Sequence, residues 1–241
     1  MSSDSVTSGQ PNHNRSRWLG TIVSQAVRFW LQSQVDSIQQ LEVQINVGHR
    51  DLVRGKIPQI AIEAAVGVYQ GIHLSQIHLN ATRIQTNLSQ VLKGKPLQLL
   101  EPIDVVCQLI QTQADFNASV SSPLLSNALG DFLQPWLQSQ MICQSIQNIV
   151  TQSITLCNQY FIIEGMLVSA DRSYPFQLQT QPQLLDAQTI VFTQSMFEAP
   201  PLIAAINLAD YPLDCGSSVE IQQLILDANA LSLQGKIQVN P

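Results

Sequence analysis

Charged side chains are scarce in this chain of 241 residues, where Asp, Glu, Lys and Arg make up 12% and hydrophobic residues 45%. This composition predicts a folded protein whose surface is made polar mainly by Gln, Ser, Asn and Thr. No run of about 18 apolar residues occurs, so we expect no transmembrane helix. The first sixteen residues are rich in Ser, Asn, Gly and Pro and lack an apolar run, which predicts a disordered start without a secretory signal.

Groups that could carry catalysis are few. The chain has no P-loop, no G-x-S-x-G or H-E-x-x-H motif and no G-x-G-x-x-G fingerprint. His73 and His78 would point to opposite faces of an uninterrupted strand, although a bulge between them could bring them together as a metal pair or as the base of a hydrolase. Surface or cross-strand histidines are the simpler interpretation. We therefore predict that the protein is not an enzyme and uses no cofactor or metal.

Cysteine pairing is not indicated by the sequence. The four cysteines are well separated, show no C-x-x-C spacing and have no histidine nearby: Cys107, Cys143, Cys157 and Cys215. This arrangement favours free buried thiols in a reducing compartment, although a disulfide remains compatible with the sequence.

Cations are concentrated at the start of the chain. Nine of the eleven Lys and Arg residues lie at or before Lys95, with five acids, whereas the remainder holds two cations and twelve acids. The first portion thus carries +4 and the second −10. One end could therefore approach anionic lipid while the other is repelled, unless both portions fold into one body over which the charges average out. The cations are too few to predict nucleic-acid binding, and aromatic and basic residues are not interleaved among them.

Two short segments place a glycine between cations with a proline just beyond. They are Arg54-Gly55-Lys56-Ile57-Pro58 and Lys93-Gly94-Lys95-Pro96, and Gln234-Gly235-Lys236 is a weaker copy. Glycine permits a tight turn and proline ends strand pairing, so the cations are predicted at loop tips. We assign contact with lipid head groups or a membrane to Arg54, Lys56, Lys93 and Lys95.

Apolar periodicity predicts an order of helix, strands, helix and strands. Residues 17 to about 40 have apolar side chains at three- and four-residue steps, and a second helix should begin at Pro123. The first helix could pack on a sheet or insert its aromatic residues into a membrane. Thr112 begins a polar cap that predicts a short helical turn. The pentapeptide Trp-Leu-Gln-Ser-Gln occurs at Trp30 and again at Trp136, which weakly supports a two-part layout.

The strand between residues 59 and 69 has one fully apolar face, and a change of parity at Ser75-Gln76 predicts a bulge or bend. Further strands are expected at 41–47, 97–110, 160–168, 184–197, 219–226 and 230–239. The fold class is therefore α+β, with long amphipathic helices packed in a strongly curved antiparallel sheet. The interior could be a packed core or an apolar groove, and we assign a groove to Ile60, Ile62, Val66, Val68, Ile72 and Leu74.

Four segments of the chain form a recognisable pattern, namely residues 52–58, 68–75, 87–102 and 114–125. They resemble the LmeA-like phospholipid-binding family, which has many bacterial members. The most specific parts are Gly94-Lys95-Pro96 and Ser122-Pro123-Leu124-Leu125, and the resemblance runs from about Trp18 to the end. It implies a lipid-binding protein with a helix held in a bent sheet, as in tubular (TULIP-like) lipid-binding domains, and it implies no catalytic residues. Family members with an envelope role carry an export signal or anchor, and we expect neither in this chain. The expectation is therefore a cytoplasmic, peripheral membrane location.

Two functions follow as competing hypotheses. In the first, residues 17–241 form one lipid-binding domain, with possible halves 17–121 and 122–241, that holds the acyl chains of a phospholipid or similar lipid and docks on anionic membranes. In the second, the core is filled, and a sheet edge or apolar helix recruits a protein partner.

Overall fold

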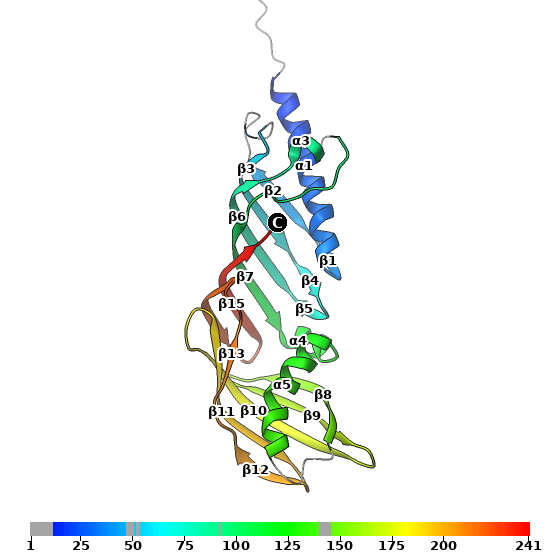
Figure 1. Cartoon of the computed structure of the whole chain (residues 1–241), viewed down its shortest axis with the longest axis vertical. Coiled ribbons are helices and arrows are strands. Elements are labelled where there is room, and N and C mark those ends of the chain that lie inside the picture. Colours follow the sequence, from blue (N-terminus) through cyan, green and yellow to red (C-terminus); the bar gives the residue numbers. More distant parts are fainter. Residues whose placement is uncertain (1–11, 47–50, 52–53, 92, 140–145) are drawn as a thin grey trace, which may run out of the picture.

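The computed structural model describes residues 12–46, 51, 54–91, 93–139 and 146–241 of the chain. These residues form an elongated molecule in which two antiparallel sheets lie one beyond the other along the long axis (Figure 1). The first sheet is strongly curled, like half of a barrel. This architecture agrees with the predicted α+β class and curved antiparallel sheet. No helix in the described part of the chain is long and apolar enough to cross a membrane.

The first sheet has the strand order β14-β15-β7-β6-β3-β2. Its members are β2 (Glu42–Asn46), β3 (Lys56–Ala64), β6 (Gln76–Gln85), β7 (Ile103–Thr112), β14 (Val219–Leu226) and β15 (Ala230–Val239). The two C-terminal strands therefore join the N-terminal part of the chain. The bounds of β14 and β15 match the predicted strands 219–226 and 230–239.

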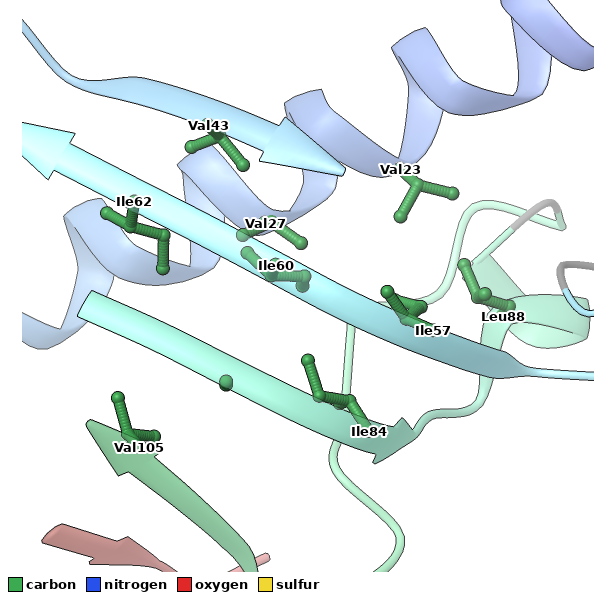
Figure 2. Close-up of a cluster of buried hydrophobic side chains, with 10 residues drawn as sticks. Val23, Val27, Val43, Ile57, Ile60, Ile62, Ile84, Leu88 and Val105 are labelled. Atoms are coloured by element: carbon green, nitrogen blue, oxygen red, sulfur yellow. The ribbon is translucent and has the colours of Figure 1, made fainter. Parts of the chain in front are cut away.

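Helix α1 (Asn12–Gln34) covers the upper part of the first sheet. Val23 and Val27 of α1 are buried against Ile57, Ile60 and other apolar residues of the sheet (Figure 2). This burial removes the apolar side chains of α1 and β3 from water together, which is the main force that holds the helix on the sheet.

The prediction that the first helix reaches about Gln40 is wrong. Helix α1 ends at Gln34, and Ser37–Gln39 form the short strand β1, which pairs with β4 (Val66–Tyr69). The Asp36 amide also donates a hydrogen bond of 2.9 Å to the Val68 carbonyl. Long-range backbone pairing thus overrides the helical periodicity of residues 35–40.

A small sheet of order β1-β4-β5 continues the molecule below α1. The β4–β5 hairpin turns at Gly71, which has φ +78°, and β5 spans Ile72–Leu74. At Ser75 the chain leaves this sheet and enters β6 of the first sheet. The predicted bend at Ser75-Gln76 is therefore present, and it is the point where the chain changes sheets.

The second large sheet has the order β12-β11-β10-β9-β8, with β13 also paired to β11. Its strands are β8 (Ile146–Leu156), β9 (Phe161–Ser169), β10 (Ser173–Leu184), β11 (Thr189–Ala199), β12 (Ile203–Asn207) and β13 (Tyr211–Asp214). Helix α5 (Pro123–Ser139) packs on this sheet through Leu129, Leu133 and Leu137, and it begins at Pro123 as predicted. Each large sheet is thus covered by one helix.

The two copies of Trp-Leu-Gln-Ser-Gln lie at the ends of these two helices. The first ends α1 at Gln34, and the second includes Ser139, where α5 ends, while its last residue, Gln140, lies outside the described part of the chain. The division of the chain into a disordered start and one domain with two halves stays a prediction. Of the predicted start, residues 1–11 lie outside the described part, and α1 begins at Asn12.

One of the three glycine segments does not form a turn. Gln234, Gly235 and Lys236 lie inside β15, where Gly235 is opposite Cys107 of β7. Gly235 is buried, and a Cβ there would lie 2.4 Å from the Glu220 carbonyl oxygen. Lys236 Nζ pairs with Glu220 Oε1 at 3.2 Å across β14 and β15. Close strand packing therefore explains this glycine, and the weaker copy is not a loop tip.

The junction between the two large sheets is formed by α4 (Gln113–Ser119). Thr112 caps α4, and Thr112 and Asp115 form a capping box, as the polar sequence predicts. Phe116 of α4 packs with Ile154, Leu156 and Phe161 of the second sheet and with Leu226 of the first. The short helix therefore fastens the two sheets to each other.

Candidate functional site

The four cations predicted at loop tips lie at one end of the molecule. The Thr86 amide donates a hydrogen bond of 2.8 Å to the Gly55 carbonyl, which joins the Arg54–Lys56 turn to the segment that enters α3 (Leu88–Val91). Helix α3 leads directly into the second turn, where the Gly94 amide donates to the Val91 carbonyl at 2.9 Å. Figure 1 shows the start of β3 beside α3 at this end.

Both turns need their glycines, since Gly55 and Gly94 have φ of +73° and +83°. Arg54, Lys56, Lys93 and Lys95 are exposed, and none makes an ion pair with the residues that the structure describes. The structure thus brings together four cations that are up to 41 positions apart in the sequence. Their contact with lipid stays a prediction.

Arg83 is a further cation at this end that the sequence did not single out. It lies near the end of β6 in the left-handed region, with φ +56°, and is exposed. Together with Lys56 and Asp51 it lines a hollow of about 330 Å³. Sequence reasoning missed Arg83 because this residue lies within a strand. Only the pairing of β3 with β6 brings it beside the first turn. We name the tip that carries Arg54, Lys56, Arg83, Lys93 and Lys95 the basic end.

Acidic groups are also present at the basic end. Asp51 lines the same hollow, and Glu101 Oε2 accepts a hydrogen bond of 2.8 Å from Gln85 Nε2. Because cations outnumber these acids, the end keeps a positive balance suited to an anionic surface.

The six residues of the predicted groove do not lie in one environment. Ile60 and Ile62 are 6% and 9% exposed and pack beneath α1 in the core of the first sheet (Figure 2). Val66 and Val68 of β4 and Ile72 and Leu74 of β5 are half-buried in the small sheet. A ligand at Ile60 and Ile62 would require α1 to move, and the assignment of these six residues stays a prediction.

A well-formed apolar cavity of about 220 Å³ lies elsewhere, between α4, α5, the second sheet and the last two strands of the first. None of its described lining residues is charged: Gln111, Phe116, Leu125, Ala128, Leu129, Phe132, Thr151, Ile154, Phe161, Ile163, Leu178, Thr180, Pro182, Ile190, Phe192, Tyr211, Leu213, Leu224 and Leu231. Aromatic rings form much of this wall, with centroids of Phe132 and Tyr211 at 4.8 Å and of Phe116 and Phe161 at 5.5 Å. The cavity is therefore suited to a flexible hydrocarbon chain.

The polar groups in the cavity wall are mostly satisfied by the protein. Thr180 Oγ1 and Ser195 Oγ share a hydrogen bond of 2.7 Å, and Gln111 Nε2 donates to Ser119 Oγ at 3.4 Å. Thr151 differs, since its buried Oγ1 has no hydrogen-bond partner among the described residues. A wall with few free polar atoms favours an apolar ligand.

An opening into the cavity lies on α5. Ala128 is exposed to solvent although it lines the cavity, whereas Leu129 next to it is 7% exposed and packs on the second sheet. The cavity therefore reaches the surface beside Ala128.

The cavity could not have been assigned from the sequence by spacing alone. Its lining comes from residues as far apart in the sequence as Gln111 at the end of β7 and Leu231 in β15, which are directly opposite each other in the sheet. One wall of the cavity, strand β10, did have a local signal in the sequence. Its glutamines alternate with Phe176, Leu178, Thr180 and Pro182, as in a strand with one buried face. We did not predict this strand.

Helix α4 is held at the cavity by a hydrogen-bond cluster around Asp115. Asp115 Oδ2 accepts hydrogen bonds from Ser75 Oγ at 2.5 Å and from the Thr112 amide and hydroxyl at 2.7 Å each. Burial alone would raise the pKa of Asp115, but these hydrogen bonds, with a smaller contribution from the charge of His73, lower it below its ordinary value. Asp115 is therefore held ionised, and it ties α4 to the bend at Ser75.

His73 and His78 lie on different strands and belong to no metal-binding group among the described residues. His73 lies in β5, and its backbone amide donates to Ser119 Oγ at 2.8 Å. His78 lies in β6, where Nδ1 is 4.0 Å from Glu63 Oε1 on the neighbouring strand. No group of three His, Cys, Asp or Glu residues within the described ranges could hold a metal ion. Cys107, Cys157 and Cys215 are free, and Cys143 lies outside the described residues.

Comparison with known proteins adds one strong match. The model of a family described as LmeA-like phospholipid-binding matches residues 15–235, nearly the whole chain. No curated protein matches the chain. No solved structure matches it either, so the predicted relation to tubular lipid-binding domains stays a prediction.

Proposed function

Because the chain belongs to the LmeA-like phospholipid-binding family, we propose that it binds a lipid by placing an acyl chain in the cavity between α4, α5 and the second sheet. The observation that carries this proposal is the uncharged, largely aromatic and aliphatic lining of that cavity. Burial of hydrocarbon there contributes about 0.8 kcal/mol for each CH₂ group removed from water. No catalytic step is needed, and the protein acts by binding.

The basic end serves a second purpose in this proposal, which is docking on an anionic membrane. Arg54, Lys56, Lys93 and Lys95 are exposed there on two short turns, with Arg83 beside them. Each cation near an anionic leaflet contributes about 1 kcal/mol, screened by salt. The sum is enough for reversible association of a peripheral protein.

One lipid cannot occupy both places at once. Lys56 is opposite Gln85 at one end of β6, and Gln76 at the other end is opposite Ile110, the neighbour of the cavity residue Gln111. Nine steps along β6 correspond to about 30 Å. An acyl chain reaches about 15 Å, half the hydrocarbon thickness of a bilayer. The head group of a lipid in the cavity therefore lies away from the four predicted head-group residues.

A blocking variant at the cavity opening tests the proposal. Ala128→Trp should place an indole at the opening and into the cavity, whereas Leu124→Trp adds the same ring on α5 at an exposed position, 47% accessible, that does not line the cavity. Native mass spectrometry of each purified protein after incubation with phospholipid vesicles should show bound lipid in the wild type and Leu124→Trp and much less in Ala128→Trp. Equal lipid in both variants would contradict the proposed cavity. Lipid-free wild type would favour the scaffold hypothesis.

A further inference from the structure

A polar cleft lies on the other side of α5 from the apolar cavity. It has a volume of about 640 Å³ and is bordered by α5 and the beginning of β8. Its polar lining consists of Ser126, Asn127, Asp131, Gln134, Gln147 and Asn148. Helix α5 thus presents Leu125, Ala128 and Leu129 to the cavity and polar side chains to the cleft.

The cleft is close enough to the cavity to receive the head group of the same lipid. Ala128 lines the cavity and Asp131 lines the cleft, and both are exposed on α5, three positions apart. Residues at this spacing are neighbours on a helix surface, with about 5–6 Å between their Cβ atoms, against about 30 Å from the cavity side of β6 to Lys56. A lipid with its chain in the cavity can therefore place its head in the cleft and not at the basic end.

The charge of the cleft differs from that of the basic end. Asp131 is the single ionisable residue among the described residues that line the cleft, and it is exposed. It makes no ion pair within the described part of the chain. The portion of the chain after Lys95 also carries ten more negative than positive charges. This environment disfavours a head group with net negative charge and leaves one carboxylate available for a cation.

The remaining polar side chains of the cleft can donate hydrogen bonds to a phosphate whose charge is balanced by an ammonium group in the same head group. Ser126 supplies a hydroxyl donor, and Asn127, Gln134, Gln147 and Asn148 supply amide N–H donors. A zwitterionic head group fits this set, with its ammonium group at Asp131 and its phosphate at the amides and the hydroxyl.

We infer that the lipid held by this protein is a zwitterionic phospholipid whose ammonium group pairs with Asp131 in the cleft. The inference rests on the proposed binding of an acyl chain in the cavity. The anionic lipids that attract the basic end are then a docking surface and not the bound ligand. The two ends of the molecule recognise different lipids.

A competition experiment tests the inference. The full chain is incubated with vesicles that contain equal amounts of phosphatidylethanolamine, phosphatidylglycerol and an uncharged glycosyl diacylglycerol with identical acyl chains. The protein is separated from the vesicles in high salt, and its lipids are quantified by mass spectrometry. Phosphatidylethanolamine should be enriched about threefold over phosphatidylglycerol, the ratio that corresponds to one exposed ion pair.

Two variants test whether Asp131 causes the preference for phosphatidylethanolamine. Asp131→Asn should bring the ratio of the two phospholipids close to one, while Asp104→Asn, the same change at an exposed position of β7 outside the cleft, should keep the wild-type ratio. Equal or greater uptake of phosphatidylglycerol by the wild type would overturn the inference, as would preferential uptake of the glycosyl lipid or an unchanged ratio in Asp131→Asn. Bound lipid without a preference overturns this inference alone, whereas no bound lipid overturns the proposed function as well.

Discussion

Ser75 Oγ donates a hydrogen bond of 2.5 Å to Asp115 Oδ2, and this contact links the bend between β5 and β6 to the first turn of α4. Asp115 also caps α4 through Thr112, and α4 carries Phe116 into the cavity wall. The position of one cavity wall therefore depends on a carboxylate at the junction of the two sheets.

Loss of this carboxylate should destabilise the protein in a pH-dependent way. Because its folded pKa is lowered, Asp115 contributes stability above its unfolded pKa of about 3.9, and the contribution is lost as the pH falls through the folded pKa. We expect Asp115→Asn to lower the free energy of unfolding by about 1 kcal/mol at pH 7. Urea denaturation at pH 7 and pH 3 should show this difference shrinking in acid. Asp210→Asn, at an exposed loop position, serves as the control, and a pH-independent loss in Asp115→Asn would contradict the account.

The glycines of the two basic turns should differ in their tolerance of a side chain. Both have positive φ, so alanine costs about 1–2 kcal/mol at either position. A Cβ at Gly55 would also lie 2.4 Å from the Thr86 carbonyl oxygen, whereas a Cβ at Gly94 would have no heavy atom within 4 Å among the described residues other than its chain neighbours. Gly55→Ala should therefore lower the unfolding free energy by at least 1 kcal/mol more than Gly94→Ala, since the added clash must be relieved. Equal losses in chemical denaturation would show that the turn at Gly55 can relax.

The hydroxyl of Thr151 should lower the free energy of unfolding of the lipid-free protein. Its buried Oγ1 has no partner among the described residues, so Thr151→Val is expected to raise the unfolding free energy by about 1 kcal/mol. Thr180→Val is the opposite case, because it breaks the 2.7 Å hydrogen bond to buried Ser195 and should cost about 1–3 kcal/mol. Denaturation of both variants measures the difference, and destabilisation by Thr151→Val would mean that its hydroxyl has a bonding partner in solution.

Membrane docking should depend on the basic end and on salt. Lys93→Gln with Lys95→Gln is expected to reduce flotation with anionic vesicles by about tenfold or more, because two contributions of about 1 kcal/mol are lost. Arg172→Gln with Lys236→Gln removes two cations outside the basic end and should leave flotation nearly unchanged. Wild-type binding should also fall as the salt concentration rises from 0.1 M to 1 M. Equal effects of the two double variants would indicate that net charge, rather than the basic end, governs docking.

Much of the fold could be predicted because its signals are local. The apolar-rich runs 219–226 and 230–239 predicted β14 and β15, the polar segment at Thr112 predicted the cap of α4, and Pro123 predicted the start of α5. The strand β10 was missed because its glutamines and its two prolines, Pro175 and Pro182, weaken the usual strand pattern. The end of α1 was misplaced because pairing of Ser37–Gln39 with β4 is decided at long range.

The candidate site was harder to predict because it depends on contacts between residues that are far apart in the sequence. The two basic turns are visible as sequence motifs, but Arg83 joins them only through the pairing of β3 with β6. The apolar residues Ile60 and Ile62 look alike in the sequence whether they face a groove or a helix, and the structure places them beneath α1. The cavity depends on residues from both large sheets and two helices, so no periodic pattern in one segment marks it.

The location of the bound acyl chain is the central claim, and photo-crosslinking tests it most directly. A phospholipid with a diazirine near the end of one acyl chain is bound to the full chain, activated by light, and its attachment sites are mapped by peptide mass spectrometry. We predict crosslinks at cavity residues such as Leu125, Phe132 and Phe161. Crosslinks confined to Ile60–Leu74, in β3, β4 and β5, would contradict the claim and would place the chain in the groove predicted from the sequence instead.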